Sequence, residues 1–288
     1  METLPEHAPG LIVEYEPGSI SLAQVEITGV AIHGNVLTAA WVGGTPPFQV
    51  ERSGDLVNWA PVGEKTEEFA YQLPIGDTTE DYLRVRGSSR SPEKSARYRV
   101  TWTSTWSAET HPTDFPGAGA HFTGLIGAAH NDQVALWERG GLASPGIKSM
   151  AETGSKGALT SEVNAAITAG TTASLLSGSG ISTPDQTTLE FDLTTDHPLV
   201  SLVCMVAPSP DWFVGVHGMS LFENGRWLET RTIALDSYDA GTDSGLSYRS
   251  PNEVTNPPVG ISRLTGAPLD VEGQIRPLGT FTFQRLRE

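Results

Sequence analysis

The sequence predicts an all-β protein made of two antiparallel β-sandwiches, the second of which carries one short helix. Short runs of residues alternate between apolar and polar side chains along most of the chain, a period of two that is typical of strands with one buried face. Glycine and proline clusters separate these runs at intervals of roughly ten residues, as in small sandwiches. The predicted strands are Val25–Ile27, Val36–Trp41, Phe48–Arg52, Phe69–Tyr71, Tyr82–Arg86, Tyr98–Trp102, Thr188–Asp192, Leu199–Val206, Phe213–Val216, Thr232–Leu235 and Gly279–Gln284.

Composition divides the chain into three parts. Residues 1–20 are acidic and interrupted by proline and glycine, so we expect a leader or tether with at most one short strand, Leu11–Val13. Residues 21–90 carry the first group of strands and predict the first sandwich, and the polar segment 87–95 predicts a linker. The second sandwich is predicted for residues 97–288.

One segment of the third part has a helical pattern. Apolar residues in Leu159–Ile167 recur four positions apart, and Thr160 or Ser161 would cap the start of this helix. Between the linker and residue 150, glycine, histidine and threonine are frequent, and we expect long loops there.

Charge and composition exclude several classes of protein. Hydrophobic residues make up 38% of the 288 residues, enough for two cores. The net charge of −16 disfavours nucleic acid and anionic lipid as partners. No apolar run approaches the roughly twenty residues of a transmembrane helix, and the first residues lack the basic start and apolar middle of a signal peptide. Cys204, the single cysteine, lies in an apolar run and is expected to be buried and unreactive.

Three carboxylates in two loop-like segments form the most focused group of candidate ligands. Asp211 follows Pro210, and Asp239 and Asp243 bracket an Ala-Gly-Thr turn. Ca²⁺ binds about six to eight oxygen atoms of carboxylates, carbonyls and water, and three anions held together repel one another without a cation. The alternative is that these aspartates accept hydrogen bonds from turn amides, as loop aspartates commonly do. Zn²⁺ is disfavoured, because no thiolate or close histidine pair is near.

Other candidate sites have weaker patterns. His111, His121 and His130 lie about ten residues apart but lack the spacing of a metal-binding helix or strand, so we expect hydrogen bonding in the core or in loops. His217 is a peripheral candidate near Asp211. Exposed aromatic side chains would offer a sugar platform, although core positions are the default for tryptophan. The candidates for that platform are Trp106, Trp137 and Trp227.

The sequence does not predict an enzyme. The segment Gly218–Phe222 lacks the second glycine of a serine nucleophile turn. A carboxylate pair for glycoside hydrolysis could come from Glu190, Asp192, Glu152 or Asp114, but the sequence does not fix their separation.

A series of motifs in fixed order carries a family resemblance. The motifs are Tyr98–Ser107, Thr110–Pro112, Ala120–Phe122, Leu125–His130, Gly141–Ser144, Ala151–Glu152, Pro208–Gly215, Asp239–Gly245, Ser250–Asn252 and Ile261–Thr265. Over residues 97–270 the chain resembles the spondin domain family, of the F-spondin and mindin type. The resemblance implies a β-sandwich similar to C2 domains with a divalent metal, here Ca²⁺, at one end. The implied ligands are Asp211, Asp239, Asp243 and, on the preceding strand, Asp192.

The chain also departs from the animal spondins. Leu221–Phe222 stands where the family has a cysteine, so the family disulfide is absent. The segment Phe48–Trp59 resembles a fibronectin type III-like module of bacterial surface proteins, with Trp41 and Trp59 as core anchors.

Together these resemblances imply a bacterial, secreted or surface-attached, calcium-binding adhesion module with an extracellular protein or glycan ligand. One alternative is a structural subunit of an extracellular assembly, which would associate with copies of itself. A more remote alternative is a calcium-dependent carbohydrate-active enzyme.

Overall fold

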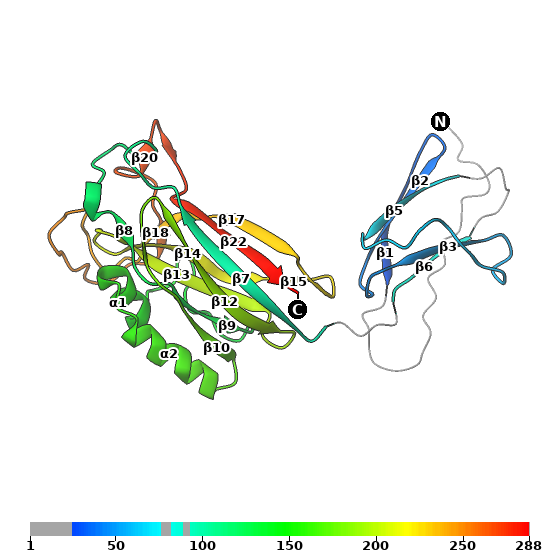
Figure 1. Cartoon of the computed structure of the whole chain (residues 1–288), viewed down its shortest axis with the longest axis horizontal. Coiled ribbons are helices and arrows are strands. Elements are labelled where there is room, and N and C mark those ends of the chain that lie inside the picture. Colours follow the sequence, from blue (N-terminus) through cyan, green and yellow to red (C-terminus); the bar gives the residue numbers. More distant parts are fainter. Residues whose placement is uncertain (1–24, 76–81, 89–92, 288) are drawn as a thin grey trace. The chain divides into compact units, whose positions relative to one another are not determined.

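The computed structural model describes residues 25–75, 82–88 and 93–287 (Figure 1). The expected leader, with its short strand at Leu11–Val13, lies outside these residues. The chain forms two compact units, one of residues 1–93 with 222–226 and one of the remainder. The described sheets are antiparallel throughout, so the all-β prediction is confirmed. None of the described helices is long and apolar enough to cross a membrane.

Two three-stranded sheets form the first unit. One has the order β1-β2-β5 and the other β4-β3-β6. Their bounds are Glu26–His33 (β1), Val36–Val42 (β2), Gln49–Ser53 (β3), Ala60–Pro61 (β4), Ala70–Pro74 (β5) and Tyr82–Arg86 (β6). The core between them contains Trp41, as predicted, with its ring edge-on to Phe48 at 5.4 Å between centroids.

The expectation for Trp59 was wrong. This side chain is only half-buried, and the guanidinium of Arg84 lies 4.2 Å from the centre of its ring. The loop before it turns outward, because the Asp55 carboxylate accepts hydrogen bonds from the amides of Val57 at 2.9 Å and Asn58 at 2.7 Å. The indole therefore lies along the guanidinium of Arg84 and is not part of the core.

The second unit is a sandwich of a larger and a smaller sheet. The larger sheet has eight strands, with the central order β10-β9-β13-β14-β18-β19. Its strands are His121–Phe122 (β8), Ile126–His130 (β9), Thr172–Ser177 (β10), Ile181–Ser182 (β11), Leu199–Ala207 (β13), Trp212–Ser220 (β14), Ser237–Asp239 (β18) and Ser262–Arg263 (β19).

The smaller sheet has four strands in the order β12-β7-β22-β17. They are Ser95–Ser104 (β7), Asp185–Thr194 (β12), Thr230–Ala234 (β17) and Gly279–Leu286 (β22). Two short hairpins complete the described strands: Phe222–Glu223 (β15) with Arg226–Trp227 (β16), and Asp270–Val271 (β20) with Gln274–Ile275 (β21). A 3₁₀ turn occupies Gly117–Gly119.

Large aromatic side chains are buried in the interior of the second unit. Trp106 is fully buried, and Trp137 and Trp227 are each 4% exposed, which excludes them as a surface sugar platform. Cys204, on the central strand β13, is buried, and burial raises the pKa of its thiol. The unreactive core position predicted for this cysteine is therefore confirmed.

Two helices cover one face of the larger sheet. Helix α2 (Gly157–Thr168) confirms the helical pattern, but it begins before Thr160 and Ser161, and neither residue is its N-cap. Helix α1 (Pro145–Thr153) was missed, since long loops were expected to residue 150. Its start and end are nevertheless marked in the sequence by a Ser-Pro pair and a left-handed glycine, Gly154.

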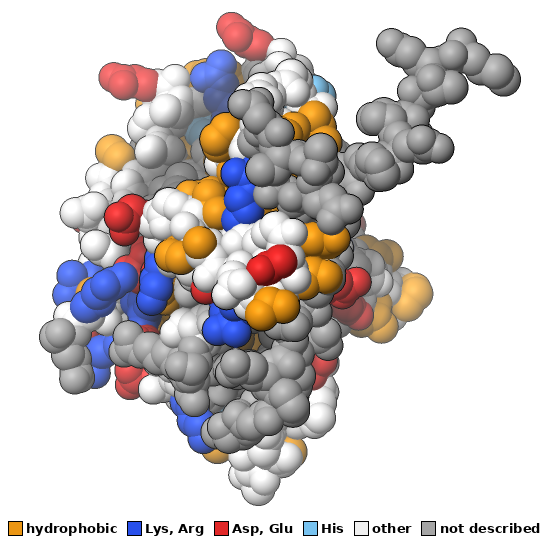
Figure 2. All heavy atoms as spheres, turned by 90° about the vertical axis from the view of Figure 1, so that its right-hand side faces the viewer, with side chains coloured by type: hydrophobic (Ala, Val, Ile, Leu, Met, Phe, Trp, Pro, Cys, Tyr) orange, Lys and Arg blue, Asp and Glu red, His pale blue; other side chains and the backbone are white. Residues whose placement is uncertain are grey.

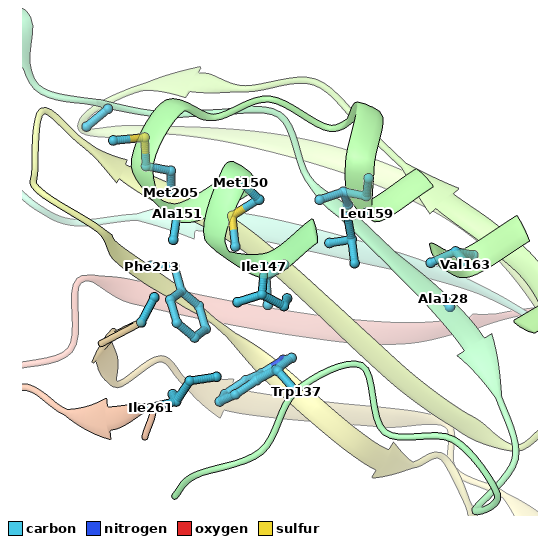
Figure 3. Packing of buried hydrophobic residues seen from close by; sticks show 14 residues of the cluster. Ala128, Trp137, Ile147, Met150, Ala151, Leu159, Val163, Met205, Phe213 and Ile261 are labelled. Atoms are coloured by element: carbon cyan, nitrogen blue, oxygen red, sulfur yellow. The ribbon is translucent and has the colours of Figure 1, made fainter. Parts of the chain in front are cut away.

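Both helices pack through small and branched apolar side chains (Figure 3). Ile147 and Met150 of α1 face Phe213 of β14, and Leu159 of α2 lies against the same layer. The ring of Trp137 meets Phe213 edge-on at 5.0 Å between centroids. The cluster therefore joins both helices to the strands that lead into the aspartate loops.

Glu162 on α2 fastens the start of α1. One carboxylate oxygen accepts a hydrogen bond from the Ser144 hydroxyl at 2.7 Å, and the other accepts one from the Gly146 amide at 2.7 Å.

We predict that Glu162→Ala lowers the free energy of unfolding of the second unit by about 1–3 kcal/mol, because both donors lose a charged acceptor. Urea denaturation measures this change.

The control is Asn164→Ala, an exposed position two residues along the same helix. Equal stability losses in the two variants would show that Glu162 does not fasten the helices.

Candidate metal centre

Strand pairing brings Asp211 and Asp239 to the same end of the larger sheet. Asp211 directly precedes β14, and its neighbour Trp212 is paired with Asp239 at the end of β18. The amide of Ala240 donates to the Asp211 carbonyl oxygen at 3.1 Å. Asp243 follows in the same loop and bridges to Val254. The three loop aspartates predicted from the sequence therefore lie within one loop cluster.

The Asp211 carboxylate is fully buried, and its two oxygens have different surroundings. Oδ2 accepts hydrogen bonds from the Thr242 amide at 2.8 Å, the Asp243 amide at 3.0 Å and the Thr242 hydroxyl at 3.2 Å. Oδ1 is buried with no hydrogen-bond partner. Burial, together with the charge of Asp239, raises the pKa of Asp211 to about 6, against the effect of the Thr242 and Asp243 hydrogen bonds.

Asp239 and Asp243 use their carboxylates to shape the loop. Asp239 Oδ1 accepts from the Gly241 amide at 2.7 Å, and Asp243 Oδ1 accepts from the Gly245 amide at 2.8 Å. Burial raises the pKa of Asp239, and the charge of Asp243 adds to this increase. The turn-capping role that was the alternative to metal binding is thus present for both residues.

A glycine is required inside this loop. Gly241 has a φ of 74°, and a Cβ there would collide with the Val259 carbonyl oxygen. Thr242, whose amide and hydroxyl both contact Asp211, was not predicted as a site residue. Its position between the two loop aspartates was the only signal in the sequence.

The structure does not bring Asp192 to this cluster. Asp192 lies exposed on β12 in the smaller sheet, opposite Arg97. The chain turns after β12 and then runs through the nine residues of β13 before it reaches Asp211, roughly 30 Å of extended chain. The strand directly before the Asp211 loop is β13, which contains no carboxylate.

The carboxylate and carbonyl oxygens of this loop cluster are the type of ligand atom that a hard cation binds. Among the residues that the structure describes, no group of three or more carboxylate, imidazole or thiolate side chains surrounds a single point. The unpartnered Oδ1 of Asp211 nevertheless offers one buried ligand atom. Asp239 would become a ligand by giving up the hydrogen bond from the Gly241 amide, and Asp243 by giving up those from the Gly245 and Glu253 amides. The loop carbonyls are further oxygen donors of the kind that Ca²⁺ accepts.

In the part of the chain that the structure describes, the histidines are not gathered into a metal site. His111 and His130 are buried and hydrogen-bonded, which confirms their expected roles, and His121 is exposed. His130 Nδ1 lies 2.7 Å from the Asn131 carbonyl oxygen, and its Nε2 lies 2.8 Å from the Ser201 hydroxyl. His217 is exposed and packs against the ring of Trp137.

The sequence of most of the second unit matches a known family. Residues 96–273, more than half of the chain, match the family described as Spondin_N. The chain belongs to the spondin family. Spondin-2 of Rattus norvegicus and of Homo sapiens are each 35% identical over 201 residues, which cover 67% of this chain and 58% of each relative. Spondin-1 of Rattus norvegicus is 36% identical over 177 residues, 59% of this chain and 22% of the relative.

The family establishes where the protein is found. Spondins are secreted proteins of the extracellular matrix, and this spondin shares the extracellular or cell-surface location expected from its motifs. The chain spans little more than half of the Spondin-2 length that it matches and less than a quarter of Spondin-1. The family match over residues 96–273 does not include residues 1–93 of the first unit.

His130 gives the second unit a dependence on pH. Burial lowers the pKa of His130 below its ordinary 6.5, so the unfolded chain binds the proton more tightly than the folded one. This contribution to stability is complete above pH 6.5 and is lost as the pH falls through that value. We predict a loss of up to about 1.4 kcal/mol per pH unit.

The measurement compares the free energy of unfolding of the wild type and His130→Gln from pH 7 to pH 5. Buried aspartates with raised pKa values change stability in the opposite direction, so the difference between the two proteins isolates the histidine. Parallel pH profiles would contradict the prediction.

Proposed function

We propose that this spondin is an extracellular recognition module whose second unit binds Ca²⁺ through Asp211, Asp239 and Asp243. The observation that carries the proposal is the buried Asp211 Oδ1, which has no hydrogen-bond partner. A buried acceptor left in this state costs about 1–3 kcal/mol. A divalent cation would remove this cost and the mutual repulsion of the aspartates together.

The chain's own groups prepare the site. The amides of Thr242 and Asp243 hold Asp211 Oδ2, which leaves Oδ1 as the oxygen available to a ligand. Bound Ca²⁺ would supply charge neutralisation and fix the loop that contains Asp239. A stiffened loop at the end of a sandwich suits the recognition of an extracellular protein or glycan, as loops on rigid scaffolds commonly do.

A structural subunit of an extracellular assembly is the second candidate function. Strand β1 favours it, independently of any metal, because among the described residues it is an outer strand of its sheet and pairs only with β2. In both functions the chain is a binding protein and not an enzyme.

The carbohydrate-active alternative has little support from the carboxylates. Arg99 Nη2 donates to the Glu190 carboxylate at 2.6 Å, and hydrogen bonds and charge from Arg99 and Arg97 lower the pKa of Glu190. A general acid for glycoside cleavage needs a raised pKa. Glu190 therefore lacks the proton that this chemistry requires.

We also propose that the first unit is a fibronectin type III-like module of bacterial type. Its two three-stranded antiparallel sheets and the buried Trp41 support this assignment. The single cysteine in the chain is consistent with a bacterial spondin that lacks the disulfide of animal relatives.

Calcium titration tests the metal site. At about a hundred times its dissociation constant, Ca²⁺ should raise the free energy of unfolding of the wild type by about 2.7 kcal/mol. Asp211→Asn should abolish most of this gain, because the amide nitrogen or oxygen that replaces Oδ1 carries no charge. Calorimetry measures both the heat of binding and the melting temperature with calcium and with a chelator.

Asp192→Asn is the matched control, with the same chemical change on the other sheet. It should retain the full calcium response. A wild type without heat of binding and without a melting-temperature rise would refute the proposed site, and loss of the response in Asp192→Asn would refute the proposed ligand set.

A further inference from the structure

Strand β1 of the first unit is an open edge. Among the described residues it pairs only with β2, through the register Gly29–Ala40 to His33–Val36. Every residue of β1 except Ile27 is exposed. An edge strand has a row of unpaired backbone amides and carbonyls, which is a template for another strand.

The same strand carries apolar side chains on the core side of its sheet. Val30 and Ile32 lie opposite Ala39 and Leu37, which are buried in the core. Residues directly opposite one another in an antiparallel pair share a face. Yet Val30 and Ile32 are each 48% exposed, so the facing sheet does not cover the core layer at this edge.

The edge also lacks the usual protection against pairing. β1 contains no lysine or proline, and its only acidic residue, Glu26, stands at its beginning. The irregularity in its register lies between Ile27 and Gly29, so the five residues from Gly29 to His33 are regular. Figure 2 shows one face of the molecule, on which hydrophobic side chains lie open among polar and charged ones.

We propose that β1 pairs with β1 of a second copy of this chain, antiparallel and centred on Ala31. In this register Val30 of each copy lies beside Ile32 of the other, so the two exposed apolar residues cover each other on the core side. Gly29 lies opposite His33, and Glu26 extends beyond the paired segment. Two three-stranded sheets then become one continuous sheet with two-fold symmetry.

The sequence of the strand favours this orientation and this occupant. A parallel pairing in the same register would place Glu26 against Glu26, and like charges directly opposite are destabilising. Each whole chain carries a net charge of −16, which opposes association. The contact itself is almost uncharged, so salt should strengthen the dimer by screening the long-range repulsion.

Ala31→Asp tests the pairing without disturbing the sandwich. Ala31 is exposed and lies opposite Thr38 on the outer face of the sheet, so the change spares the core. In the dimer it places two aspartates against each other on the symmetry axis, and it should weaken association by roughly tenfold or more. Val57→Asp is the control, with the same added charge at a loop position 77% exposed in the same unit.

Sedimentation velocity on the full chain, over a range of concentrations and salt, measures the association. The proposal expects a wild-type dimer, tightened by salt, retained in Val57→Asp and weakened in Ala31→Asp. Hydrogen exchange adds a direct readout, because amides between Gly29 and His33 should gain protection as the dimer forms.

Two outcomes would overturn the proposal. One is a wild type that stays monomeric at every concentration and salt. If removal of residues 1–24 from this monomer then creates a dimer, the proposal is overturned as well, because the edge of the full chain would be occupied by its own first residues. The other is a dimer that Ala31→Asp and Val57→Asp affect equally.

Discussion

The pairing of β14 with β18 is the constraint on which the candidate site depends. It sets Asp211 beside the loop that begins after Asp239. The amides of that loop donate to Oδ2 of Asp211 and leave Oδ1 without a partner. A carboxylate with one oxygen fully satisfied and one unpartnered is an asymmetric group. The strand that positions it is itself held in place, since Phe213 of β14 packs in the apolar cluster under α1 and α2.

Much of the fold could be predicted because its strands follow simple alternation. The runs around Trp102 and Phe281 have one apolar face each, and that face is the one buried. Helix α1 was missed because it is short and its start is a Ser-Pro pair within a glycine-rich stretch, which is also typical of a loop. Trp59 was misplaced for a related reason. A large aromatic residue favours burial, but the hydrogen bonds of Asp55 direct its loop outward.

The sequence predicted the clustering of the candidate aspartates where they lie close along the chain, and it misplaced the one that lies far from the others. Asp239 and Asp243 share one turn, and their loop returns to Asp211 through strand pairing. Asp192 was assigned by its distance along the chain, and this reasoning took β12 for the strand that leads into the site. Strand β13, which contains no carboxylate, lies between them. The hydrogen bonds of Thr242 depend on the folded loop and leave no pattern in the sequence.

The single cysteine gives the protein an internal reporter. Cys204 lies at the centre of the larger sheet, between β9 and β14, with no exposed surface, and the first unit has no thiol at all. A thiol-specific reagent can therefore reach its target only when the second unit opens. The rate of labelling under native conditions would measure how often that unit opens, separately from any movement in the first.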